Sequence, residues 1–161
     1  MNSEKIIIRK TLIHDIEAIL GLIKELALFE KAPEQVSNTV EQMTKEGFGK
    51  EPAFESIVAE CNGQIVGMAI FFIKYSTWKG KGVYLDDIYV KESERRKGIG
   101  KMLFDEVIRI AANKEAHQLH WQVLDWNRPA IEFYKKYNAE LDSEWINCKL
   151  NREQILKLSQ S

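Results

Sequence analysis

The order of apolar and polar positions along the 161 residues predicts alternating strands and helices. Short runs rich in β-branched and aromatic residues indicate strands, because such side chains suit a pleated, half-buried surface. Apolar residues spaced three or four positions apart indicate amphipathic helices. The pattern predicts strands at 5–10, 54–61, 64–75, 83–90, 117–124 and 145–150, and helices at 15–29, 38–47, 101–113, from 127 onward and at 152–158.

Residues with special backbone preferences mark the ends of several elements. Asn62-Gly63 lies between two apolar runs, which is a strong signal for an antiparallel hairpin. Asn38 has the spacing of a helix cap, and Asn127 is predicted to cap a later helix whose first turn holds Pro129. Together the elements predict an α/β fold, a mixed central sheet flanked by helices.

Length and composition favour a single domain over residues 1–161, since 45% hydrophobic residues suffice for one core. No apolar run approaches the roughly 18 residues of a membrane span, and the first ten residues carry charges where a secretory signal needs apolar residues. We therefore expect a cytoplasmic protein. Cys61 and Cys148 are too few and too far apart to suggest a metal site or a disulfide framework, so buried free thiols and no metal are expected.

The formal net charge of −1 conceals an uneven distribution of charge. Residues 30–60 contain seven glutamates and three lysines, whereas basic residues gather near position 96. The absence of a dominant basic face argues against a nucleic-acid-binding protein. The acidic segment suits a cationic substrate, although a merely solvated acidic surface is an equally good interpretation of this segment taken alone.

The candidate chemistry is concentrated in residues 83–100. Asp86 and Asp87 interrupt an otherwise apolar strand, and a turn containing Gly98 and Gly100 follows. Glycines let the backbone approach a ligand, and the first N–H groups of a helix have no partner within that helix, so such a turn can bind a phosphate. Full positive charges come from Arg95, Arg96, Lys97 and Lys101.

The spacing of the glycine turn excludes two nucleotide-binding motifs. A dinucleotide-binding fingerprint would need a third glycine where Leu103 stands, and the spacing does not fit a Walker lysine. A solvated basic loop that caps a helix is the simplest interpretation of a lone G-x-G. His120, within a predicted strand, is more often a structural residue than a general base. No histidine stands beside either cysteine, which argues against a cysteine nucleophile.

Two motifs together carry a resemblance to a known family. Arg95, Gly98 and Gly100 resemble the acetyl-CoA motif of the GNAT N-acetyltransferases, and residues 127–134 are similar to the family's N-x-x-A-x-x-F-Y run. The resemblance covers nearly the whole chain and is strongest to the spermidine/spermine (diamine) acetyltransferases and their thialysine-acetylating relatives. Residues shared with that subgroup include Trp78, Tyr84, Leu85, Asp87 and Trp126.

The resemblance implies that acetyl is transferred from acetyl-CoA to a primary amine of a small polyamine- or diamine-like substrate, by direct attack in a ternary complex. Acetylation of thialysine or another amino-acid-like amine, or of a protein or peptide, is the alternative. A CoA-binding regulatory module without catalysis is a third hypothesis. The resemblance also implies a homodimer, with a small cationic amine as partner. The charge distribution and the lack of a long apolar run predict that neither nucleic acid nor a membrane is a partner.

The same resemblance assigns roles to individual residues. Asp86 is expected to take the amine proton, Asp87 to help bind the cation, and Tyr134 to protonate the leaving sulfur. Many subgroup members have glutamate where this chain has Asp86, so a water relay is favoured. Ser76 replaces a usual acidic residue, which favours a shorter or less charged amine than spermine. The expected coenzyme-binding residues are Ile88, Tyr89, Val90, Arg95, Arg96, Lys97, Gly98, Ile99, Gly100, Lys101, Asn127, Ala130 and Tyr134, and the expected substrate-binding residues are Phe29, Glu30, Trp78, Asp86, Asp87 and Gln122.

Overall fold

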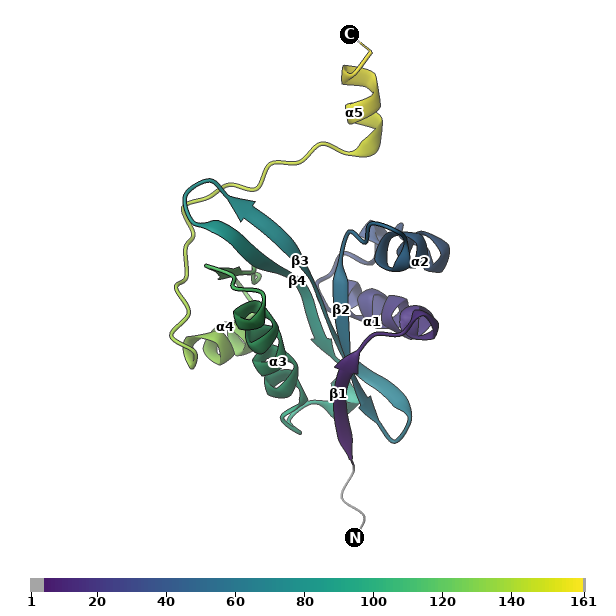
Figure 1. Cartoon of the computed structure of the whole chain (residues 1–161), viewed down its shortest axis with the longest axis vertical. Coiled ribbons are helices and arrows are strands. Elements are labelled where there is room, and N and C mark those ends of the chain that lie inside the picture. Colours follow the sequence, from purple (N-terminus) through teal and green to yellow (C-terminus); the bar gives the residue numbers. More distant parts are fainter. Residues whose placement is uncertain (1–4, 161) are drawn as a thin grey trace. The chain divides into compact units, whose positions relative to one another are not determined.

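The computed structural model describes residues 5–160, which form two compact units, one ending at Gln122 and the other beginning at Val123. The first unit contains a five-stranded sheet of order β1-β2-β3-β4-β5 (Figure 1). Strands β1 to β4 pair antiparallel and β5 lies parallel to β4, so the predicted mixed sheet is confirmed. The strands are β1 (Ile6–Lys10), β2 (Glu55–Cys61), β3 (Gln64–Ser76), β4 (Gly80–Val90) and β5 (Leu119–His120).

Helices cover both faces of this sheet. In Figure 1, α1 and α2 lie on one side of the strands and α3 on the other. Short 3₁₀ turns at Ile13–Asp15, Pro33–Gln35 and Glu92–Glu94 lead into or follow the longer elements. The helices of the first unit are α1 (Ile16–Phe29), α2 (Val40–Phe48) and α3 (Ile99–Asn113), and those of the second are α4 (Arg128–Lys135) and α5 (Arg152–Leu158).

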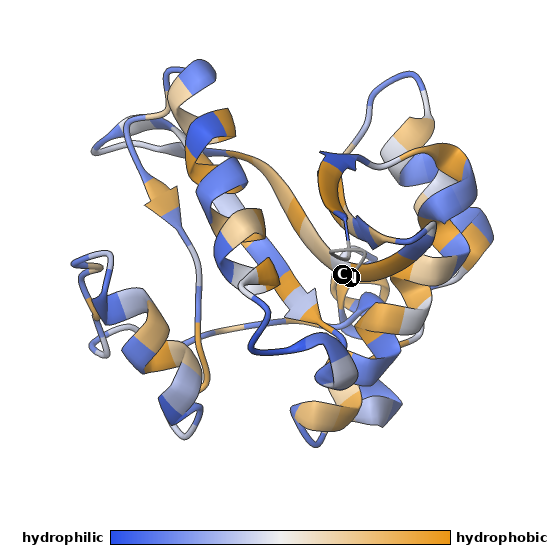
Figure 2. Cartoon of the chain, turned by 90° about the horizontal axis from the view of Figure 1, so that it is seen from below, coloured by the Kyte–Doolittle hydropathy of each residue, from blue (hydrophilic) through white to orange (hydrophobic). Residues whose placement is uncertain are grey.

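Apolar side chains from the helices and strands form the core of the first unit. Figure 2 shows apolar residues concentrated on the strands and mixed with polar residues around the helices. Each fully buried aliphatic or aromatic side chain contributes roughly 1.5–3 kcal/mol. A Cβ on Gly67 would lie 3.1 Å from the side chain of Leu103, so glycine lets α3 pack closely on β3. The α1 face buries Ile16, Ile19, Leu20, Leu22, Met43, Val58, Met68, Ile70 and Tyr89, and α3 itself buries Ile99, Leu103, Phe104 and Val107.

Local signals predicted the turns and caps with one exception. Asn62 and Gly63 both have positive φ, at 51° and 80°, as the tightest hairpin turn requires. The Asn127 side chain accepts a hydrogen bond from an N–H in the first turn of α4, which confirms that cap. The cap of α2 is Thr39, whose hydroxyl accepts from the N–H of Gln42, and not Asn38 as expected.

The β3–β4 hairpin is longer than the sequence indicated. The predicted strands at 64–75 and 83–90 leave seven residues between them, but Ser76 pairs with Gly80 and only residues 77–79 turn. The Ser76 hydroxyl accepts hydrogen bonds from the N–H groups of Trp78 and Lys79 and closes this turn. Hydrogen bonding between the strands thus extends the ladder through residues that lack strong strand propensity.

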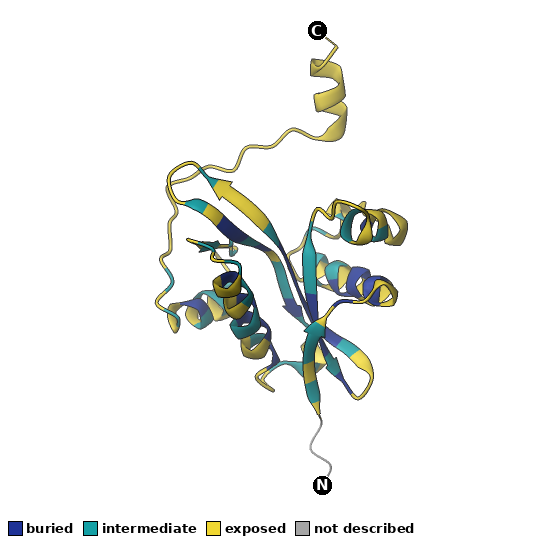
Figure 3. Cartoon of the chain, viewed as in Figure 1, coloured by how far each residue is buried: buried dark blue, intermediate teal, exposed yellow. Residues whose placement is uncertain are grey.

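Two strand predictions near the end of the chain were wrong or too long. The expected strand at 117–124 is reduced to Leu119–His120. Residues 145–150 pair with no strand of the described chain, and Trp145 and Ile146 are 74% and 88% exposed. Figure 3 shows the second unit exposed along its whole length from residue 141. A segment with strand propensity forms a strand only when another strand pairs with it. Cys148 lies in this unpaired segment and is exposed, contrary to the expectation of a buried thiol. Cys61 is buried, as expected.

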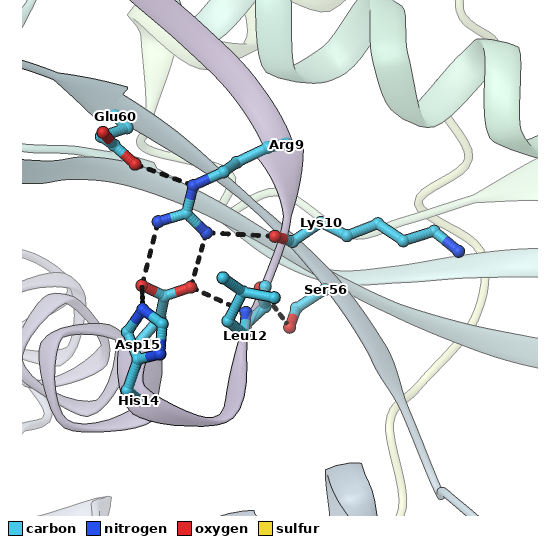
Figure 4. A network of polar contacts seen from close by, with 8 residues as sticks. Arg9, Lys10, Leu12, His14, Asp15, Ser56 and Glu60 are labelled. Atoms are coloured by element: carbon cyan, nitrogen blue, oxygen red, sulfur yellow. Dashed lines mark hydrogen bonds and ion pairs between the residues drawn. The ribbon is translucent and has the colours of Figure 1, made fainter. Parts of the chain in front are cut away.

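An ion network joins β1, β2 and the start of α1 (Figure 4). The Arg9 guanidinium donates to both carboxylate oxygens of Asp15, at 2.7 and 3.1 Å, and its Nε donates to Glu60 at 2.8 Å. Asp15, only 4% exposed, also accepts from the N–H of Leu12. The hydrogen bonds from Arg9 hold the pKa of Asp15 below its usual value.

Replacing Asp15 with asparagine should lower the free energy of unfolding at pH 7 by about 2 kcal/mol, less than the roughly 3–5 kcal/mol of a fully buried pair. The expected loss is smaller than for a fully buried pair because the Arg9 side chain is 26% exposed, so solvent screens its interaction with Asp15. A carboxyl with a lowered pKa stabilises the fold above its unfolded value near 3.9, and this stabilisation is lost as pH falls. Urea unfolding at pH 7 and near pH 3 measures both effects. Lys24→Gln, at an exposed position of α1, is the control, and an equal Asp15→Asn deficit at the two pH values would contradict the ion-pair explanation.

Candidate active site

Strand β4 contains an extra residue at its centre. In the ladder with β3, Asp87 lies opposite Ile70 and Leu85 lies opposite Phe71, which leaves Asp86 without a partner. A bulge of this kind interrupts the hydrogen-bond ladder, bends the strand and changes where its side chains point. The sequence indicated an interruption at the two aspartates but not its form.

The bulge decides which face of the sheet each side chain occupies. Tyr84 pairs with Phe72 and Asp87 pairs with Ile70, and Ile70 belongs to the core beneath α1. Phe72 is two residues from Ile70 on the same strand and therefore shares its face. Residues three apart on a regular strand would point to opposite faces, but the added residue brings Tyr84 and Asp87 to the same face, the one that α1 covers.

Three carboxyl groups interact on this face. Burial raises the pKa of Asp87 to about 7, and the charges of Asp86 and Glu30 add to the shift. Glu30 follows the last residue of α1, and partial burial raises its pKa as well. Asp86 is more exposed than its neighbours on β4, yet partial desolvation of its carboxyl raises its pKa as well. The group is therefore poised to hold a cation and to accept a proton near neutral pH.

An aromatic wall adjoins the carboxylates. The Tyr84 ring contacts Phe72 and, edge to face, His120, with both pairs of ring centres 5.2 Å apart. The Lys74 ammonium lies 5.1 Å from the centre of the Tyr84 ring and 3.1 Å from Nδ1 of His120. Burial raises the pKa of the Tyr84 phenol, and so do the charges of both aspartates. The hydroxyl end of Tyr84 is thus close enough to the two aspartates for their negative charges to disfavour its ionisation.

Arg95 holds the end of β4 against α1. Its guanidinium lies 5.2 Å from the Phe29 ring and 5.3 Å from the Tyr89 ring, and its Nε donates to the Val90 carbonyl at 3.2 Å. Two cation–π contacts and a backbone hydrogen bond favour this folded-back position. The side chain expected to meet a phosphate, and the Phe29 ring expected to meet the substrate, therefore contact each other.

The turn before α3 has the geometry expected of an anion site. Gly98 has a φ of 80° and directly precedes α3. The helix begins at Ile99, two residues earlier than position 101, where the sequence predicted its start. The first bond of the helix runs from Met102 N–H to the Gly98 carbonyl, so the amides of residues 99–101 have no acceptor within the helix. A Cβ on Gly98 would meet no atom within 4 Å, which leaves the amides approachable. This turn is the strongly hydrophilic stretch that leads into α3 in Figure 2.

The basic side chains of the turn are partly neutralised. Lys97 forms an ion pair with Glu94 at 2.9 Å, and Lys101 forms one with Asp105 at 2.5 Å. Arg96, at φ 66°, is exposed. A phosphate at this turn would therefore rely on backbone amides and the helix dipole as much as on full charges.

The end of β4 offers a free edge. Ile88, Tyr89 and Val90 pair with β3 on one side, whereas β5 pairs with β4 only at Val83 and Tyr84. On the β5 side no strand of the described chain pairs with β4 beyond Tyr84. Unpaired backbone groups there suit an extended ligand arm that binds as an added strand.

The second unit contains the remaining predicted residues. Asn127 and Ala130 form the cap of α4, with the side-chain Oδ1 of Asn127 accepting from the Ala130 N–H at 3.3 Å. Tyr134 is only 6% exposed, and burial raises the pKa of its phenol to about 12. Its ring lies edge to face with Phe133, at 5.3 Å. A phenol with this pKa stays protonated at neutral pH and can donate its proton.

Two expected substrate residues are not brought to the carboxylates. Trp78 sits in the turn of the β3–β4 hairpin and is 83% exposed. From Gly80, where β4 begins after this turn, six residues of strand lead to Asp86, roughly 20 Å at about 3.3 Å per residue. Gln122 is exposed two residues beyond His120, the last residue of β5. Within the chain as described, Trp78 is therefore a tip residue of the hairpin.

Sequence reasoning missed the aromatic wall and Lys74. The adjacent aspartates within an apolar strand were a usable signal for the bulge, but no local pattern marked the contact of Lys74 with Tyr84.

Residues 5–160 contain no group of three or more histidine, cysteine, aspartate or glutamate side chains arranged to hold a metal ion. Within the same range, none of the helices combines the length and the apolar character that a membrane span requires.

Comparisons with known proteins identify the family. The sequence model of the Acetyltransferase (GNAT) family matches residues 20–139. Thialysine N-epsilon-acetyltransferase of Bos taurus is 39% identical over 153 residues, covering 89% of this chain and 90% of the relative. Spermidine/spermine N(1)-acetyltransferase-like protein 1 of Homo sapiens is 34% identical over 155 residues, covering 90% of this chain and 22% of the relative.

Solved structures share the fold at lower identity. An integron cassette protein from the mobile metagenome of V. cholerae superposes with a TM-score of 0.78 at 22% identity, covering 99% of this chain and all of that chain. Aminoglycoside N-acetyltransferase AAC(6')-Iy, solved in complex with CoA, gives a TM-score of 0.73 at 20% identity, covering 94% and 97% of the two chains. The chain thus belongs to the GNAT family of acetyltransferases and is an acetyl-CoA-dependent N-acetyltransferase related to the thialysine and spermidine/spermine enzymes.

Proposed function

We propose that this enzyme acetylates a primary amine of a small polyamine- or diamine-like substrate by direct attack in a ternary complex. The observation that carries the proposal is the group of Asp86, Asp87 and Glu30 on one face of the bulged strand, with the pKa of Asp87 near 7. An amine arrives as an ammonium ion, which these carboxylates attract, and it must lose a proton before it can attack.

The two aspartates divide the work on the amine. Asp87, the more buried, holds the ammonium, and Asp86 takes its proton through a water molecule. The charge of Asp86 adds to the effect of burial in raising the pKa of Asp87, so the titrations of the two carboxyl groups are coupled. Asp86 is suited to pass the proton on because it is exposed and, as the bulge residue, lies outside the hydrogen-bond ladder.

The coenzyme would be bound more by backbone groups of the protein than by its side chains. Residues 88–90 would bind the pantetheine arm through the free edge of β4, and the amides of residues 98–101 would bind the pyrophosphate. In the second unit, Asn127 and Ala130 would contact the coenzyme and Tyr134 would donate a proton to the leaving sulfur. Acetyl-CoA itself supplies the activated thioester.

Replacing Gly98 with valine should weaken CoA binding by tenfold or more, because a branched side chain would occupy the open space over the turn and disfavours a φ of 80°. Gly63→Val is a matched control, since Gly63 has the same φ and equally open surroundings in the β2–β3 turn. Titration calorimetry with CoA gives both dissociation constants. Equal affinity of the two variants for CoA would show that the turn does not bind the pyrophosphate.

A substrate screen tests the proposed function directly. Acetyl-CoA turnover would be measured with putrescine, spermidine, spermine, thialysine and a lysine-containing peptide. Turnover with the small amines and little with the peptide is expected, because the carboxylate group is compact. The thialysine alternative is supported by several relatives of that name at 36–39% identity.

The exposed apolar residues of the second unit, Trp145 and Ile146 among them, agree with a homodimer, which stays a prediction.

A further inference from the structure

A cavity of about 380 Å³ lies at the end of α3 opposite the turn at Gly98. Its lining comes mainly from the last turns of α3, the end of β1, the start of β2 and the segment that follows α2. The 15 residues of α3 rise about 1.5 Å each, so the two ends of the helix are roughly 20 Å apart. The volume is typical of a small-molecule site, and the cavity is separate from the turn.

Strand alternation places this cavity and the three carboxyl groups of the active site on opposite faces of the sheet. Arg9 bonds to Asp15 before α1, so the next residue, Lys10, points to the other face, the one that α3 covers. Figure 4 shows the Lys10 side chain extending away from the Arg9 network. Ile57 lies opposite Lys10 and shares its face, whereas Asp87 lies on the face of α1. The cavity is therefore not part of the candidate active site.

The floor of the cavity is apolar. Ile57 and Phe71 line it and are only 1% and 2% exposed. The Phe54 ring packs on the last turn of α2, where a Cβ on Gly47 would lie 2.6 Å from it. The volume is more than twice the roughly 150 Å³ that encloses one benzene molecule. The cavity can therefore hold a ring and a short chain.

The basic residues that line the cavity have donors to spare. Lys114 forms an ion pair with Glu55 at 2.6 Å, so these two charges offset each other. Glu106 accepts from Nε and Nη2 of Arg109, which leaves Nη1 to donate to a ligand. Lys10 forms no ion pair with any carboxylate of the described chain. Two cationic groups thus remain for an anion, although the chain as a whole carries a net charge of −1.

Two hydroxyl groups supply a further donor beside Lys10. Ser56 Oγ and Thr11 Oγ1 are 2.8 Å apart, and both residues line the cavity. One hydroxyl proton makes this bond, so the other is left to donate. Thr11 is only 8% exposed, and a buried donor is stabilised when it meets an acceptor oxygen. The lining therefore favours an anionic ligand over a neutral or cationic one.

We propose that this cavity is a second binding site, which takes a small monocarboxylate with an apolar body of about one ring. The ring lies on the floor formed by Ile57 and Phe71, and the carboxylate accepts hydrogen bonds from Lys10 and Arg109. Charge-assisted hydrogen bonds are stronger than neutral ones, so the carboxylate gives the site its selectivity. Binding here does not depend on which amine the active site accepts.

Phenylacetate is a probe of the expected size and charge. Phenethyl alcohol and phenethylamine have the same ring and chain length with a neutral and a cationic end, and acetate has the charge without the ring. Each probe would be titrated into the isotope-labelled full chain saturated with CoA, so that an anion cannot bind at the coenzyme site. The amide signals of Gly47 and Ile57 report on the cavity, and that of Gly98 reports on the turn before α3.

Phenylacetate should shift the Gly47 and Ile57 signals with a dissociation constant on the order of 1 mM, the range expected for a ligand of this size. Phenethyl alcohol should bind at least about fivefold more weakly, because it cannot form the charge-assisted hydrogen bonds. Phenethylamine and acetate should not shift these signals, since the first has the wrong charge and the second lacks the ring.

Lys10→Gln should weaken phenylacetate binding about five- to tenfold, a moderate loss because Lys10 is exposed and water screens its charge. Asn113→Trp, at an exposed position of α3 that lines the cavity, should abolish the shifts by filling the space. Lys24→Gln on α1 makes the same change in net charge and should alter the affinity less than about twofold. Equal affinities for phenylacetate and the alcohol, or equal effects of the two lysine variants, would overturn the proposal. Shifts at Gly98 without shifts at Gly47, or no shifts up to about 20 mM, would do the same.

Discussion

Tyr134→Phe should lower kcat by about 10²- to 10⁴-fold, the usual contribution of a general acid or base. The substitution removes only the hydroxyl, so the packing of the ring against Phe133 is kept and KM for acetyl-CoA should change little. The expected loss arises because the departing thiolate has no proton donor. The raised pKa of Tyr134, about 12, keeps the donor protonated throughout the neutral range.

Tyr137→Phe is a matched control for this experiment. Tyr137 also packs against Phe133, at 5.4 Å, and follows the same helix, but it is not the motif tyrosine. Steady-state kinetics with both substrates saturating, together with thermal unfolding of both variants, would separate catalysis from packing. If Tyr134→Phe keeps more than about half of the wild-type kcat while losing stability, Tyr134 is a structural residue and a water molecule must supply the proton.

Asp86→Asn should reduce turnover by about 10²-fold or more at pH 7 and by much less at high pH. At neutral pH the amine arrives as an ammonium ion and needs the carboxylate to take its proton. At high pH a growing fraction arrives already deprotonated, so the deficit should shrink as pH rises. A pH–rate profile from pH 6.5 to 10 measures this trend. A deficit that stays constant over that range would show that Asp86 binds the cation or shapes the site without carrying a proton.

Asp87→Asn is the informative comparison for Asp86→Asn. Its main kinetic effect should be a raised KM for the amine, because Asp87 holds the ammonium. The pKa of Asp87 is raised to about 7, well above the unfolded value near 3.9, so its contribution to stability is greatest below pH 4 and is lost as pH rises through 7. The asparagine variant should therefore be more stable than wild type at pH 8 and lose this advantage near pH 4. Such a gain in stability with a loss of function is typical of active-site charges.

The sequence alone determined the local elements and the chemistry they carry. Apolar periodicity placed α1, α3 and the first four strands to within a few residues, and Asn62-Gly63 and Asn127 specified a turn and a cap. These features depend on a residue and its near neighbours, and that information is complete in the chain. The phosphate turn was predictable for the same reason, since glycine spacing and a helix start are local.

Tertiary structure decided the features that depend on pairing between distant segments. Asp86 became a bulge only through the register of β3 against β4, and that register moved Asp87 to the face of Tyr84. The pKa of Asp87 required Glu30 from the end of α1, and the position of Lys74 required Tyr84 and His120 from two further strands. Residues 145–150 show the same dependence in reverse, because their strand propensity found no partner in the described chain. Side-chain direction, desolvation and charge coupling are set by neighbours in space, and the order of residues along the chain does not state which neighbours those are.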